Sequence, residues 1–96
     1  MRSQPKSHRL QQLAIAQFVR ELRAIMQLSQ EKFADELGMT FATINRWENG
    51  RATLSPLALK QIDTLLNQLA QAPNVTLRER SQALRGKYFL AKEANA

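Results

Sequence analysis

The sequence contains no cysteine, one histidine, and only three glycines and three prolines among 96 residues. Without cysteine, the chain can form neither a disulfide nor a thiolate metal site. The histidine, His8, lies near the N-terminus, and the adjacent acids Asp35 and Glu36 point to different faces of an expected helix. Neither a glycine-rich phosphate loop nor a metal-ligand cluster is found. We therefore expect no enzymatic activity, no metal and no cofactor.

Long apolar runs and strand patterns are also lacking. The first ten residues have no apolar signal core, and no apolar run approaches the length of a membrane span. A chain of this length forms one small domain, whose core is adequate for a helical bundle and would gain from oligomerisation. We therefore expect an all-α, cytoplasmic, nucleoid-associated protein.

The net charge of +6 is concentrated at the two ends of the chain. Residues 1–27 carry five basic side chains and one acidic side chain. Residues 28–73 carry four basic and five acidic side chains, and residues 74–96 carry five basic and two acidic side chains. Cationic ends around a nearly neutral middle suggest attraction to nucleic-acid phosphates, which supply most of the sequence-independent affinity for DNA.

The first nine residues are expected to form a flexible basic arm. Serines, glutamine and proline argue against ordered structure there, while the cations Arg2, Lys6 and Arg9 would strengthen attraction to a phosphate backbone. The alternative is a solvated terminus whose charges only keep the protein soluble.

The segment SQEKFADELGMTFATINRWENGR, residues 29–51, predicts two short helices joined by a tight turn. Its leading serine is an N-cap candidate for a helix over Gln30 to Leu37. Gly38 should end that helix, because glycine readily adopts the left-handed conformation that closes a helix C-terminus. Thr40 is then the N-cap of a second helix over Phe41 to Glu48. Two helices crossed in this way form a device that places one helix in a DNA groove.

This segment resembles the helix-turn-helix of the phage Cro and C1 repressors, the XRE family of bacterial regulators. Ala34 matches the small residue of the motif, Gly38 matches its turn glycine, and Ile44 and Trp47 match two apolar positions of its second helix. The sequence WENGR ends the motif, as in many members. The resemblance extends from about Phe18 to about Leu69. It implies a compact four- to five-helix bundle of the phage-repressor type that binds double-stranded DNA.

The resemblance implies that the second helix enters the major groove, with base-reading candidates Phe41, Ala42, Thr43, Asn45 and Arg46. Arg46 is the strongest candidate, because a guanidinium can bridge O6 and N7 of guanine with about 1–3 kcal/mol of discrimination. A phosphate contact or a surface salt bridge is its alternative. Phe41 and Ala42 replace the polar pair of many relatives, and Phe41 could press on thymine methyls or be a core residue of the turn.

Phosphate contacts are expected from Gln30, Thr40, Asn49 and Arg51. In the resembling family a glutamine at the position of Gln30 clamps the DNA backbone, and the residues matching Asn49 and Arg51 hold a second phosphate stretch. The alternatives are an exposed helix-start glutamine, helix capping by Asn49 and plain solubility for Arg51. The family also pairs an arginine matching Arg23 with a glutamate matching Glu48 beneath the recognition helix, although such a pair need not add net stability.

Further helices are expected on both sides of the motif. A first helix should run from near Leu10 to near Gln27, and another from Pro56, behind the N-cap Ser55, to about Gln71. Residues 76–92 have the spacing of an additional amphipathic helix, although Gly86 weighs against it. This extension could meet a second subunit, but folding back on the bundle is favoured. The expected organisation is an arm over 1–9, a DNA-binding domain over 10–72 and a basic, partly helical extension over 73–96.

We therefore expect a small bacterial or phage regulator that binds a palindromic operator as a homodimer. Two alternatives remain open at this stage. The chain could be the antitoxin of a toxin–antitoxin pair, docking on the toxin through residues 74–92 while it represses its own operon. It could also be a protein-interaction module that has lost DNA binding, in which Phe41 meets an apolar partner.

Overall fold

The computed structural model describes the backbone of residues 6–90 and the side-chain surroundings of residues 11–89. Expectations for residues 1–5 and 91–96 lie outside these residues. All regular secondary structure in the described part is helical, which confirms the all-α prediction. Its elements are α1 (Lys6–Met26), α2 (Gln30–Leu37), α3 (Phe41–Glu48), α4 (Pro56–Leu69), α5 (Val75–Arg85) and a π-helical turn, η1 (Gly86–Leu90).

The helix-turn-helix has the predicted bounds because its caps form as expected. The hydroxyls of Ser29 and Thr40 accept the backbone amides of Lys32 and Thr43, each at 3.1 Å. Gly38 ends α2 with φ 67°, and its amide bonds back to the last turn of that helix. Ser55 caps α4 in the same way.

Two boundaries differ from the sequence prediction. Helix α1 begins at Lys6, four residues before the expected start near Leu10, so residues 6–9 of the expected flexible arm are helical. Residues 6–9 contain no glycine or proline, so nothing in them stops the helix from extending. Helix α4 ends at Leu69, slightly before Gln71.

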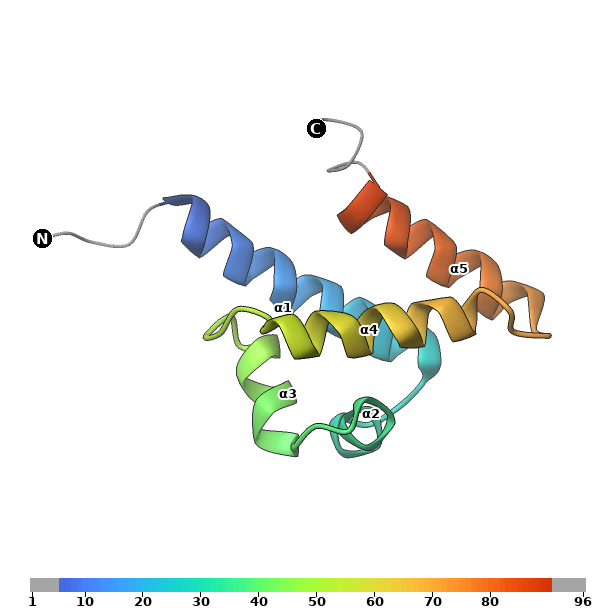
Figure 1. Ribbon diagram of the computed structural model, residues 1–96, viewed down its shortest axis with the longest axis horizontal. Coiled ribbons are helices and arrows are strands. Elements are labelled where there is room, and N and C mark those ends of the chain that lie inside the picture. Colours follow the sequence, from blue (N-terminus) through green and yellow to red (C-terminus); the bar gives the residue numbers. More distant parts are fainter. Residues whose placement is uncertain (1–5, 91–96) are drawn as a thin grey trace, which may run out of the picture.

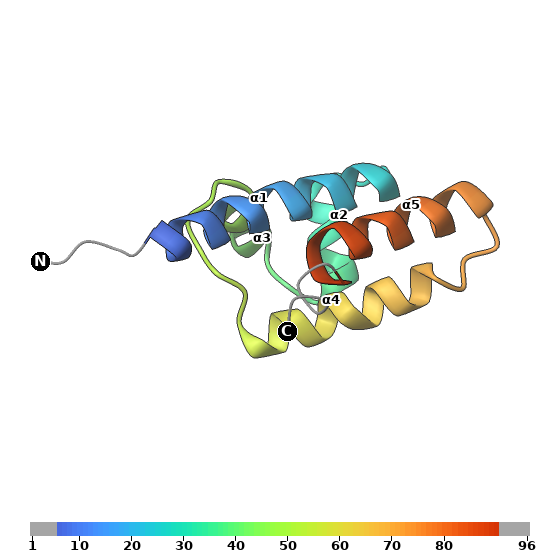
Figure 2. The same ribbon diagram turned by 90° about the horizontal axis from the view of Figure 1, so that it is seen from above.

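Three long helices form the upper part of the molecule, and the two short helices of the motif pack beneath them (Figure 1). Seen from above, α5 lies between α1 and α4 (Figure 2). Every helix contributes to one buried core, which contains Phe18, Val19, Leu22, Phe33, Ala34, Leu37, Ile44, Trp47, Ala58, Ile62, Leu65, Leu66, Leu69 and Leu84. The motif is therefore held on a rigid base made partly of the C-terminal extension.

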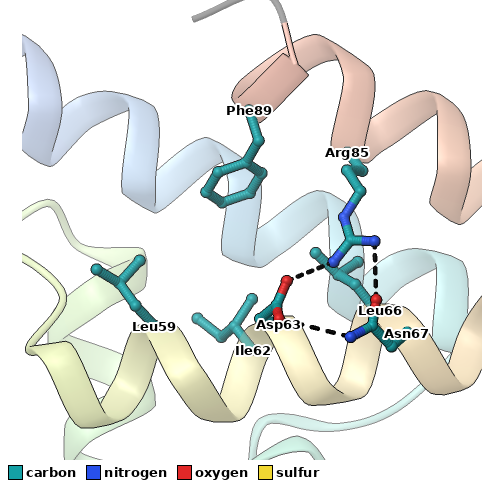
Figure 3. A pocket seen from close by; sticks show the side chains of 7 residues that line it. All are labelled: Leu59, Ile62, Asp63, Leu66, Asn67, Arg85 and Phe89. Carbon is teal, nitrogen blue, oxygen red and sulfur yellow. Dashed lines mark hydrogen bonds and ion pairs between the residues drawn. The ribbon is translucent and has the colours of Figure 1, made fainter. Parts of the chain in front are cut away.

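The C-terminal extension folds back on its own bundle, as favoured from the sequence. Leu84 is buried in the core, and Arg85 of α5 bonds to Asp63 at 2.6 Å and to Asn67 at 3.0 Å on α4 (Figure 3). The rings of Tyr88 and Phe89 each meet Phe18 edge-on, with centroids 5.3 Å apart. Both side chains belong to η1, so this turn is packed against α1.

A polar contact also ties η1 to α1. The hydroxyl of Tyr88 donates to Glu21 at 2.6 Å, and Lys87 lies 3.2 Å from the same carboxylate oxygen. The hydrogen bond from Tyr88 lowers the pKa of Glu21, with Lys87 adding to the effect. Burial, together with the bond to Glu21, raises the pKa of Tyr88. The extension is thus fastened to the bundle by apolar, aromatic and ionic contacts.

Candidate nucleic-acid interface

Helix α3 has one face in the core and one face in solvent. Ile44, Trp47 and Glu48 are buried, whereas Ala42 and Arg46 are exposed and Phe41 is 49% exposed. The alternative that Phe41 is a core residue of the turn is therefore wrong. Thr43 and Asn45 are half-buried at the border between the two faces. All five base-reading candidates lie on the outer face or its border.

The first turn of α3 is held by a pair of threonines. The hydroxyls of Thr40 and Thr43 lie 2.8 Å apart, and Thr40 also accepts the Thr43 amide. Arg46, one turn further on, makes no side-chain hydrogen bond or ion pair with any described residue. Its guanidinium therefore keeps all its donors for a ligand.

A polar network runs beneath the outer face of α3 and joins three helices. Arg23 of α1 makes two bonds to the Glu48 carboxylate, at 2.7 and 2.9 Å. Gln30 of α2 donates to Glu48 at 3.1 Å and accepts from Asn45 at 3.4 Å, and Asn49 in turn donates to Asn45 at 3.0 Å. Gln30 is therefore fixed against α3 and is not simply an exposed glutamine at a helix start.

The ion pair at the centre of this network is largely withdrawn from water. The Glu48 side chain is 5% exposed and that of Arg23 is 27% exposed. The hydrogen bonds to Glu48 raise the pKa of Arg23. Because the carboxylate is buried and accepts three hydrogen bonds, its charge is satisfied internally and contributes little repulsion toward a phosphate.

Arg20 is a contact that the sequence analysis did not identify. Its guanidinium donates to the backbone carbonyl of Glu48 at 2.6 Å. A cation at this end of α3 also interacts favourably with the helix dipole. The sequence feature that could have identified Arg20 is its position three residues before Arg23, which puts both arginines on one face of α1. Together they hold the C-terminal end of the recognition helix.

The chain leaves α3 through a tight turn. Gly50 has φ 69°, and the amide of Arg51 bonds to the carbonyl of Arg46 at 3.0 Å. Asn49 and Arg51 are exposed just beyond the helix, as Thr40 is just before it. Three of the phosphate candidates thus lie at the two ends of α3, and the fourth, Gln30, is bonded to Asn45 and Glu48.

None of the helices over residues 6–90 has the length and apolar character needed to cross a membrane.

The fold and the outward face of α3 define a helix-turn-helix protein. A family model described as helix-turn-helix matches residues 19–70, more than half of the chain. The chain therefore belongs to the Cro/C1-type helix-turn-helix family, whose domains bind DNA and are not enzymes. The matched range agrees with the resemblance expected from about Phe18 to Leu69. Neither a comparison with curated proteins nor one with solved structures gave a match.

Proposed function

We propose that this protein is a cytoplasmic transcriptional regulator that inserts α3 into the major groove of an operator. The observation that carries the proposal is the division of α3. Its inner face is anchored by Ile44, Trp47 and the Arg23–Glu48 pair, while its outer face is exposed and contains an arginine without an ionic partner among the described residues. A rigid helix with an open polar edge is what direct readout of base pairs requires.

Base reading is assigned to Phe41, Ala42, Thr43, Asn45 and Arg46. Arg46 bridges the two acceptors of a guanine, because its donors are not used within the described structure. Phe41 and Ala42 are exposed apolar groups at the leading end of α3, suited to contact with thymine methyls. Discrimination therefore comes from one guanidinium and a small apolar edge.

Phosphate contacts are assigned to Gln30, Thr40, Asn49 and Arg51. Gln30 donates one amide hydrogen to Glu48. A carboxamide nitrogen has a second hydrogen, which can bind a phosphate oxygen near the N-terminus of α2. The network thus places Gln30 relative to Asn45, so that phosphate binding and base reading stay in register.

We further propose that the protein works as a homodimer on a palindromic site. An eight-residue helix is only about 12 Å long at 1.5 Å per residue, so one α3 reads few base pairs. Two subunits related by a two-fold axis double the reading length, with half-site centres roughly 34–36 Å apart. Residues 10–72 are proposed as the DNA-contacting unit, and residues 75–89 of the extension over 73–96 complete its core.

The antitoxin alternative is less well supported. It requires residues 74–92 to dock on another protein, whereas Val75–Leu90 packs on α1 and α4 of the same chain. The interaction-module alternative would be strengthened by an exposed Phe41 on a recognition face without a cation. Phe41 is 49% exposed, but Arg46 is exposed on the same face, so only the first condition is met.

The test is fluorescence anisotropy with duplexes selected from genomic fragments. Arg46→Ala should weaken binding to the selected site by about 5- to 150-fold while binding to unrelated duplexes falls much less, because a base contact of about 1–3 kcal/mol is lost. Lys60→Ala is the matched control, since it removes the same charge from an exposed position on α4. Equal losses in the two variants, or no salt-dependent binding by the wild type at about 50 mM salt, would refute the proposal.

A further inference from the structure

A hollow of about 510 Å³ lies beside the recognition helix. Its wall is formed by α1, the turn before α3, α3 itself, the segment 51–55 and the start of α4, and it contains Gln12, Arg46, Trp47, Arg51 and Thr53. Two of these residues, Arg46 and Arg51, already belong to the proposed DNA-binding surface. Gln12 does not, and it precedes the family-matched residues 19–70.

Gln12 is an unusual residue for its environment. It is only 9% exposed, yet its side chain makes no hydrogen bond with any described residue. No side-chain nitrogen or oxygen in the described part of the chain is both fully enclosed and without a partner. The carboxamide of Gln12 must therefore reach solvent, and the hollow that it lines provides that access. An amide that meets solvent, and bonds to no described protein group, keeps its donors and acceptor for a ligand in the hollow.

The charge of the hollow indicates which ligand it suits. Arg46 and Arg51 are exposed at its edge and make no ion pair with described residues, and none of the residues that line it is acidic. The Gln12 amide nitrogen adds two neutral donors to the lining of the hollow. Several N–H donors and a positive field around one cavity match a phosphate group, whose oxygens accept several charge-assisted hydrogen bonds.

We propose that Gln12 and Arg51 bind one backbone phosphate of the DNA, with Arg46 adding positive charge at the edge of the hollow. The proposal rests on the proposed function, since it assumes that α3 lies on DNA. It makes α1 a direct contact of the nucleic acid and gives the protein a phosphate site that includes a residue outside the motif. Helix α1, which contains Gln12, is fixed to α3 through Arg20 and Arg23. A phosphate bound by Gln12 and Arg51 is therefore held in a fixed position relative to α3.

The first test compares two variants of equal net charge in anisotropy titrations with a mixed-sequence duplex at about 50 mM salt. Gln12→Glu places a carboxylate in the hollow, whereas Gln11→Glu places it one residue away at an exposed position. Gln12→Glu should bind at least tenfold more weakly than Gln11→Glu. Gln12→Leu should bind three- to tenfold more weakly than the wild type, with Gln11→Leu unchanged. Equal affinities within each pair would overturn the proposal.

A double-mutant cycle adds a specific readout. If Gln12 and Arg51 hold the same phosphate, the losses caused by Gln12→Leu and Arg51→Gln should be less than additive when combined. Fully additive losses would overturn the shared site. Far-ultraviolet circular dichroism of each variant establishes that it is folded before its affinity is compared.

The second test needs no substitution and therefore does not depend on how variants fold. The side-chain amide resonances of Gln12 in the wild type are followed by NMR during addition of the duplex and, separately, of inorganic phosphate at constant ionic strength. A shift with the duplex supports the proposal. A shift with inorganic phosphate alone assigns the hollow to a small anion and overturns the DNA contact, as does no shift in either titration while the duplex binds. If the wild type does not bind the duplex at all, the proposed function itself fails.

Discussion

Glu48 is a negative charge in the centre of a DNA-binding motif, and its surroundings explain why it is compatible with that place. Its carboxylate accepts two hydrogen bonds from Arg23 and one from Gln30. A side chain so enclosed acts as a fixed connection between α1, α2 and α3 rather than as a surface charge.

Removal of this connection should be costly. Glu48→Ala leaves Arg23 partly buried without its partner, so we expect the free energy of unfolding to fall by roughly 2–3 kcal/mol, measured by urea denaturation. The fall should be below about 0.5 kcal/mol for the control Glu36→Ala, an exposed acid of α2. A similar small change in both variants would show that the network does not stabilise the fold.

The contact between Tyr88 and Glu21 predicts a particular dependence of stability on pH. The pKa of Glu21 is lowered on folding, so its contribution is present above the ordinary value near 4.5 and is lost as the pH falls through the folded value. The pKa of Tyr88 is raised, so its contribution is present below pH 10.0 and is lost as the pH rises through the folded value.

Tyr88→Phe should therefore destabilise the protein by roughly 1 kcal/mol at neutral pH, and the difference from wild type should shrink at both extremes. Urea denaturation across the pH range measures this difference. Because Tyr88 is the chain's single tyrosine, phenolate absorbance reports it alone. A phenolate transition at pH 10.0 in the folded protein would contradict the contact.

At the scale of elements, the caps and turns of the motif were predictable because they depend on neighbouring residues. Ser29, Gly38 and Thr40 each act within one helical turn, and α2 and α3 have the bounds that these residues predicted. Two of the three glycines, Gly38 and Gly86, differ, however, in a way that the sequence does not reveal. Gly38 has φ 67°, whereas Gly86 has φ −61° in right-handed helical conformation with no atom within 4 Å of an added Cβ.

Substitution by alanine should therefore have opposite effects at these positions. Gly86→Ala should raise the free energy of unfolding by roughly 0.5–1 kcal/mol, because alanine fits there and reduces the entropy of the unfolded chain. Gly38→Ala should lower it by roughly 1–2 kcal/mol, because alanine is strained in the left-handed region. Thermal unfolding of both variants measures the two changes in stability. The same sign of change at both sites would contradict the assigned conformations.

For the molecule as a whole, the C-terminal extension is part of the core although it lies beyond the family-matched residues 19–70. Leu84 is its one buried apolar side chain among the described residues, and the aromatic rings of η1 cover Phe18. We therefore expect the extension and the motif to unfold together.

Leu84→Ala tests this expectation in the full chain. Leu84 is 4% exposed, so truncation should lower the free energy of unfolding by about 2–4 kcal/mol while a single urea transition is retained. Leu59→Ala removes the same atoms from a side chain that is 43% exposed and should change stability by less than about 1 kcal/mol. Equal effects of the two substitutions, or two separate transitions, would show that the extension is docked only loosely.

The sequence by itself determined the helix-turn-helix, its caps, its family and the all-α class, because these follow from signals within about one helical turn and from the spacing of apolar residues. Tertiary structure alone decided which polar side chains meet. Arg20 reaches a carbonyl 28 residues away, and Gln12 lines a hollow formed by α1, α3, α4 and two connecting segments. Such contacts depend on how the helices are packed against one another, and the residues of a single helix do not specify that packing.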